Sequence, residues 1–329
     1  MPTLAAQPGL SIRLSNFIFA RKPGIEVDAW KTWTAEEKPD LNRAVARLNG
    51  YVLEGAGEIL VCAASDFENF MAPRPVLNEQ ALQELTEVTR VIASHRWPIR
   101  IHATYDEPIT RILDVFEQVF KETDYRSRWA IDHAETIPTH NIARVKALGG
   151  GIAIQNRLAF TGEFFLERYG EQASASTAPI QEIVHAGIPV GAGTDATRVN
   201  SYNPWLSLAW IVTGQTAGGT QIASPSNRPS REEALWLYTL GSVWFSGEED
   251  VKGRIAPDQY ADFAILSADY LSVPEEQIGT IESVLTVTGG DVVYSAPPFT
   301  TFAPEQLSSV HPEWSPVAVF GGFQRADEA

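Results

Sequence analysis

The chain has 329 residues, which is enough for one barrel-sized domain with a small appendage or for two ordinary domains. Its formal net charge of −16 repels phosphate backbones, so we expect no nucleic-acid partner, and no apolar run is long enough to predict a membrane span. The first eight residues lack the pattern of a signal peptide, and a single cysteine, Cys62, excludes an intramolecular disulfide framework. These features predict a cytoplasmic protein.

The first part of the chain predicts two strands. Residues 11–20 begin with alternating apolar and polar side chains, which is typical of a strand. The apolar, glycine-punctuated segment 51–62 predicts a loop followed by a strand over residues 58–63, near Cys62. Between the two strands, residues 40–48 have a helical pattern.

From residue 78 onward, predicted helices alternate with short apolar strands. The helices carry apolar side chains at spacings of three and four residues. This alternation predicts βα units and a parallel sheet. The predicted helices span residues 78–95, 107–123, 139–148 and 178–186, and the predicted strands span residues 97–102, 129–133, 152–155 and 188–192, with a loop before residue 178.

The pattern changes after residue 195. Residues 203–212 and 231–240 predict two further helices, and residues 281–294 predict a β-hairpin around two glycines. We therefore expect a first domain over residues 1–250, a small β unit over residues 251–296 and an irregular tail over residues 297–329.

Three strands end in residues that can bind a metal ion. His102 and His133 close two strands, and Asp195 follows the apolar strand 188–192. In a barrel of alternating strands and helices, active sites are built at the carboxyl ends of the strands. Two imidazoles and one carboxylate there form a partial shell for zinc or another divalent ion. Taken alone, each residue has a simpler interpretation, as a hydrogen-bonded histidine or a turn-capping aspartate.

These motifs, together, resemble those of the amidohydrolase superfamily, and more narrowly of the YtcJ-like, type 3 amidohydrolases. The resemblance is carried by residues 102–106, 132–135, 193–196 and 253–263. It implies an α/β fold, a (β/α)8 TIM-type barrel with a β-sandwich appendage, and a metal-dependent hydrolase of amide bonds, often with zinc. It also implies that His102, His133 and Asp195 bind the metal. His133 and Asp195 are then the catalytic residues, and Asp195 accepts a proton from the activated water.

The chain departs from that family at its start. It has no His-X-His motif, and the strand at residues 11–20 resembles the third strand of the family, so we expect an incomplete barrel of about six strands. The lysine that bridges metals after the fourth strand is not evident either, and Glu54 and Cys62 are both candidates for its position. The edge beside residues 11–20 would be left open, filled by residues 1–50 or covered by a second chain, as in a homo-oligomer.

Polar loop residues near the strand ends are candidates for substrate contacts, although solvated loop polarity explains them equally simply. They are Tyr105, Gln155, Arg157, Arg198 and Asn203. Asp106 and Glu135 are candidates to orient a histidine, and helix capping is the alternative for Asp106.

Two functions of different class follow. The favoured one is a metal-dependent amidohydrolase that uses activated water on a C–N bond of a small molecule. The alternative is a catalytically impaired barrel remnant that acts as a binding or interaction protein or is a gene fragment, because the His-X-His motif is missing.

Overall fold

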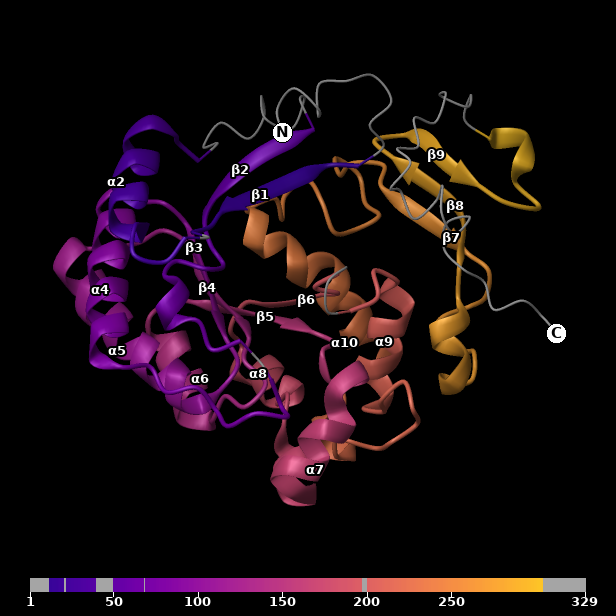
Figure 1. The fold of residues 1–329 in the computed structure, drawn as a ribbon. Helices are drawn as coiled ribbons and strands as arrows, with labels where there is room; N and C mark the ends of the chain where they lie inside the picture. Colours follow the sequence, from indigo (N-terminus) through magenta and orange to yellow (C-terminus); the bar gives the residue numbers. More distant parts are fainter. Residues whose placement is uncertain (1–11, 21, 40–49, 68, 197–199, 304–329) are drawn as a thin grey trace, which may run out of the picture.

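Six parallel strands form one curled sheet in the structure, a computed structural model that describes residues 12–20, 22–39, 50–67, 69–196 and 200–303. The strands follow one another in sequence order, and the sheet bends into a half-barrel (Figure 1). The strands are β1 (Leu14–Ile18), β2 (Tyr51–Ala56), β3 (Ile99–Ala103), β4 (Trp129–His133), β5 (Gly151–Gln155) and β6 (Val190–Gly193). The described residues thus form six barrel strands, the predicted number, and no closed eight-stranded barrel.

Helices connect the strands and cover the outer face of the sheet. The first four lie side by side along the convex side (Figure 1), and the apolar face of α5 is buried, with Ile109, Ile112 and Phe116 fully covered. The helices are α2 (Glu26–Glu36), α4 (Glu79–Ser94), α5 (Asp106–Thr123), α6 (Thr139–Ala147), α7 (Leu158–Ser176), α8 (Ile180–Ala186), α9 (Pro204–Thr213) and α10 (Arg231–Trp236). All six predicted helices are confirmed, with α10 continuing into a π-helical turn, η3 (Leu237–Gly241).

Two segments correct the prediction. β2 ends at Ala56 and not near Cys62, because Gly57 takes a φ of 142° and turns the chain out of the strand. Residues 158–176, expected as a loop, form α7, which bends at Gly170 (φ 81°). Its exposed Phe160 and Phe164 blur the apolar stripe by which a helix is recognised. The helical pattern at residues 40–48 lies outside the described residues.

The edge of the sheet at β6 is covered by the segment that follows α9. The π-helical turn η3 packs along β6, and the hydroxyl of Ser242 accepts a hydrogen bond from the Ala192 N–H (3.1 Å) and shares its proton between the carbonyls of Ala192 (2.9 Å) and Leu237 (2.7 Å). The approach is close, since a Cβ added at Gly191 would lie 2.7 Å from the Ser242 Cα. A hydroxyl therefore satisfies a backbone N–H and C=O that a neighbouring strand would otherwise pair.

The opposite edge is β1, as predicted. Among the described residues β1 pairs with β2 alone, so its outer side has no strand partner. Arg13, the residue before β1, forms an ion pair with Asp262 and lies over the ring of Tyr260, 4.7 Å from its centroid. These contacts bring the start of β1 against the C-terminal part of the chain.

A second, antiparallel sheet of three strands represents the predicted β unit (Figure 1). Its strands are β7 (Phe263–Leu266), β8 (Ser283–Thr288) and β9 (Asp291–Ser295). The predicted hairpin is confirmed, and Gly289 and Gly290 form its turn with φ of 64° and 94°, which glycine adopts without strain. Most of the predicted irregular tail lies outside the described residues.

No helix within the described part of the chain is both long enough and apolar enough to cross a membrane.

Candidate metal centre

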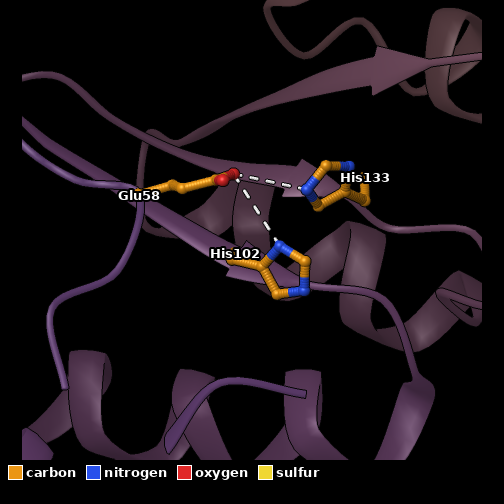
Figure 2. A group of neighbouring side chains, drawn as sticks. All are labelled: Glu58, His102 and His133. Atoms are coloured by element: carbon orange, nitrogen blue, oxygen red, sulfur yellow. Dashed lines mark ion pairs between the residues drawn. The ribbon is translucent and has the colours of Figure 1, made fainter. Parts of the chain in front are cut away.

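Three side chains meet where β2, β3 and β4 end (Figure 2). His102 is the fourth residue of β3, His133 is the last residue of β4, and Glu58 lies two residues beyond β2. Because the three strands are parallel neighbours, their carboxyl ends lie at the same edge of the sheet. The imidazole rings of His102 and His133 are 4.4 Å apart between centroids.

The backbone of His133 explains how its side chain reaches the site. The register pairs Asp132 with His102, and alternate residues of a strand point to opposite faces, so in a regular strand His133 would point away from the side of Asp132. His133 instead takes a φ of 79°, and Ala134 follows with a φ of 55°. Such left-handed conformations are unusual for residues with a Cβ and occur often at functional sites.

The three side chains have the spacing of metal ligands. The Oε2 atom of Glu58 lies 3.3 Å from Nε2 of His133 and 3.7 Å from Nδ1 of His102 (Figure 2). In a tetrahedral shell with bonds of about 2.1 Å, neighbouring ligand atoms are roughly 3.4 Å apart. Two imidazole nitrogens and one carboxylate oxygen, all within 4.8 Å of one another, therefore fit a divalent metal ion.

A fourth residue, Asp66, holds the far side of His102. Its carboxylate is fully buried, lies 3.5 Å from Nε2 of His102 and accepts hydrogen bonds from the backbone N–H groups of Thr104 (3.0 Å) and Tyr105 (2.8 Å). A carboxylate at one ring nitrogen of a histidine fixes the ring and leaves the other nitrogen for a metal. Asp66 thus directs Nδ1 of His102 toward Glu58.

The pKa values of the two carboxyl groups beside His102 are shifted in opposite directions. Burial opposes the ionisation of Glu58, but the hydrogen bonds and charge of His102 and His133 outweigh it and hold the pKa of Glu58 below its usual range. Burial raises the pKa of Asp66 to about 6, although His102 and the amides of Tyr105 and Thr104 favour its ionised form. The group that faces both imidazoles is therefore the one most readily ionised.

A pocket of about 320 Å³ opens beside this cluster. Glu58 and His133 line it together with Asp195, which follows β6, and Gln155, the last residue of β5. Asp195, like His133, has a left-handed backbone, with a φ of 53°. The structure thus brings Asp195 and Gln155 to the same pocket as the ligand cluster, and their roles as metal ligand and substrate contact remain predictions.

Of the other predicted residues, none that the structure describes lines this pocket. Tyr105 is fully buried in the core, with its ring against Phe70, and Asn203 caps α9 by accepting a hydrogen bond from the N–H of Trp205 (3.0 Å). Arg157 is partly buried at the start of α7, and Arg198 lies outside the described residues. Asp106 begins α5 and forms an ion pair with Arg74. The carboxylate that contacts His102 and can orient it is that of Asp66.

Glu58 and Asp66 were missed by the sequence analysis. The candidates named for the bridging position were Glu54, which is buried within β2, and Cys62, whose Sγ lies 3.7 Å from the Ala20 carbonyl oxygen. Glu58 carried a usable signal, because it follows a glycine-punctuated strand end as Asp195 follows Gly193 and Thr194. Asp66 carried none, since only the fold brings its loop to His102.

Comparisons with known proteins identify the family of the chain. The model of the amidohydrolase family matches residues 1–294. Two relatives are 24% identical: YtcJ of Bacillus subtilis (strain 168), over 60% of this chain and 37% of that protein, and the N-substituted formamide deformylase of Arthrobacter pascens, over 60% and 36%. The chain therefore spans little more than a third of the length of these relatives.

Solved structures share the fold. An uncharacterized metal-dependent hydrolase from Pyrococcus furiosus superposes with a TM-score of 0.57 at 22% identity, over 78% of this chain and 51% of that one. Another from Pyrococcus horikoshii OT3 is 26% identical, with a TM-score of 0.50, over 59% of this chain and 39% of that one. With the family model covering most of the chain, the predicted resemblance is confirmed, and the protein belongs to the amidohydrolase family.

Proposed function

We propose that this protein is a metal-dependent hydrolase that cleaves an amide-type C–N bond of a small molecule, with zinc as the metal. The observation that carries the proposal is the convergence of Glu58, His102 and His133, whose ligand atoms lie within 4.8 Å of one another. A bound divalent ion would supply Lewis acidity and lower the pKa of a water molecule.

The residues around the cluster have separate tasks in this proposal. Glu58, His102 and His133 hold the ion, and Asp66 orients His102 through Nε2. Asp195, at the wall of the same pocket, accepts the proton of the attacking water and passes it to the leaving amine. Gln155, from the neighbouring strand end, offers an amide for a hydrogen bond to the substrate.

The pocket walls favour a small substrate with an apolar substituent. Phe17 and Phe19 line the pocket of about 320 Å³. Because a relative is named for N-substituted formamides, we propose these compounds as the first substrates to test. Small N-alkyl and N-aryl acetamides complete the test series.

The first test is the variant Asp195→Asn in the zinc-loaded protein. Removing the proton acceptor should lower the rate of amine release by about 100-fold or more at saturating zinc, where the loss of one carboxylate charge does not limit the zinc content. Asp106→Asn is the matched control, since Asp106 also follows a strand of the sheet but is paired with Arg74. Unchanged turnover in Asp195→Asn would remove this residue from the mechanism.

The same experiment separates an enzyme from a binding protein. Zinc uptake that requires His102 and His133, without turnover of any compound in the series, would favour the barrel remnant that binds a ligand. Failure of the wild-type protein to take up zinc, cobalt or manganese would overturn the metal proposal itself.

A further inference from the structure

One partly buried cation stands beside the metal centre and has no part in the proposed mechanism. Arg100 precedes His102 by two residues in β3, so both side chains point to the same face of the sheet. Its guanidinium lies between two aromatic rings, 5.4 Å from the centroid of Phe17 and 5.5 Å from that of Phe245. These rings come from β1 and from the segment that covers β6, so Arg100 lies across the opening of the half-barrel.

The position of Arg100 is fixed by Asp132. The Nε atom of Arg100 lies 3.1 Å from both carboxylate oxygens of Asp132, and Nη2 also donates to Oδ1. Asp132 is nearly fully buried, whereas 28% of the Arg100 side chain is exposed, toward the pocket. A two-point contact between a guanidinium and a carboxylate holds the cation in one orientation.

Two more carboxylates share the pocket with this pair. Glu58 and Asp195 line the same cavity as Arg100 and Asp132. Three carboxylates and one guanidinium line the pocket, so the lining carries a net charge of two negative, and Asp66 adds a further carboxylate behind His102.

We propose that Arg100 is a built-in counter-cation that restricts this centre to a single divalent metal ion. The inference rests on the proposed metal site and adds its stoichiometry. One divalent ion neutralises the pocket lining, whereas a second would add a net charge of two positive beside a fixed guanidinium in a partly buried site, where charges interact more strongly than in water. The positive charge of Arg100 thereby takes the place of the charge that a second metal ion would bring.

This role predicts effects of opposite sign for the two members of the pair. Arg100→Met makes the pocket more negative, so it should bind a divalent ion about tenfold more tightly or take up a second equivalent. Asp132→Asn makes the pocket less negative and should weaken binding about tenfold. The double variant restores the wild-type charge and should bind one equivalent with nearly wild-type affinity. If the pair served only to shape the site, all three variants would bind more weakly.

The experiment is a calorimetric titration of the chelator-treated full chain with Zn²⁺ and with Co²⁺, combined with elemental analysis of the dialysed protein. Circular dichroism checks the fold of each variant. Arg100→Lys keeps the charge and should keep a stoichiometry of one. If Arg100→Met does not fold, the double variant and Arg100→Lys still decide the question, because both retain the net charge of the pocket.

Three results would overturn the inference. A wild-type chain that binds two equivalents, weaker binding in both single variants, or a double variant that loses its metal would each remove the counter-cation role while leaving a metal-dependent hydrolase in place. A wild-type chain that binds neither ion would overturn the proposed function, and the inference with it.

Discussion

The two edges of the parallel sheet are completed in different ways. At β6, the segment from α10 to Phe245 packs along the strand, and Ser242 bonds to both backbone groups of Ala192. At β1, the described residues supply no strand on the outer side, and contact with the rest of the chain includes the ion pair of Arg13 with Asp262. The comparison shows that the backbone N–H and C=O groups of an edge strand can form hydrogen bonds without a further strand, provided that a polar side chain takes the place of the missing strand's backbone.

The largest expected effect tests the close packing at the β6 edge. In Gly191→Ala, the new Cβ would lie 2.7 Å from the Ser242 Cα and 2.8 Å from a ring carbon of Phe245, so the covering segment must shift. We expect the free energy of unfolding to fall by about 1–3 kcal/mol, measured in urea.

Gly193→Ala is the matched control in the same strand. A Cβ at Gly193 would meet no atom within 4 Å, and this variant should change the free energy of unfolding by less than about 0.5 kcal/mol. Equal effects at the two glycines would show that the covering segment is not held tightly against β6.

The next effect tests the hydroxyl that replaces the ladder. Ser242→Ala leaves the Ala192 N–H without its partner, and we expect a loss of about 1–2 kcal/mol in the free energy of unfolding. Hydrogen exchange at the Ala192 amide should accelerate in parallel. Ser246→Ala, in the same segment, removes only a bond to the Val243 carbonyl and should have the smaller effect. An unchanged free energy of unfolding in Ser242→Ala would mean that water can replace the hydroxyl as the partner of the Ala192 N–H.

A pH titration tests the same covering segment through Tyr238 in η3. Burial raises the pKa of Tyr238 to about 12 from an ordinary value of 10.0. The folded state therefore favours the neutral phenol, and this stabilisation is complete below pH 10 and lost as the pH rises toward 12. At pH 11 the wild-type protein should lose about 1 kcal/mol relative to Tyr238→Phe.

The comparison for that titration is Tyr294→Phe, at an exposed position of β9. It should follow the wild-type dependence of the unfolding free energy on pH between pH 9 and 11. Identical curves for the wild type and Tyr238→Phe would show that the covering segment admits water around the phenol.

The smallest effect is expected at the β1 edge. Arg13→Met removes a partly exposed ion pair with Asp262, and such pairs contribute about 0–1 kcal/mol, less at high salt. The measurement is urea unfolding at low and high ionic strength. A loss above about 2 kcal/mol would show that the three-stranded sheet supports β1 as strongly as the covering segment supports β6.

Local patterns were sufficient for most of the fold and half of the site. The strands ending in His102 and His133 are short, apolar and flanked by amphipathic helices, so their order and their polar end residues can be recognised within the sequence itself. Their convergence follows from the parallel sheet, because neighbouring strands end together.

The remaining features depend on contacts between distant residues. β2 ends where Gly57 lies against Arg100, 43 residues later, and that strand end decides that Glu58, and not Glu54 or Cys62, faces the histidines. The capping of Ala192 by Ser242 and the placement of Asp66 beside His102 also join distant segments. No periodicity in the sequence encodes such contacts.

The seam between β2 and β3 has a consequence for ligand exchange. These strands share a single register pair, Ala56 with Ile99, whereas β3 and β4 share five. Glu58 lies on one side of the seam, and both histidines lie on the other. The carbonyl of Glu58 nevertheless accepts a hydrogen bond from the N–H of His102 (3.1 Å), so the backbone of the carboxylate ligand is fixed to that of a histidine ligand. An ion held by all three should therefore be released by rotation of the Glu58 side chain, while the two imidazoles stay together on their paired strands.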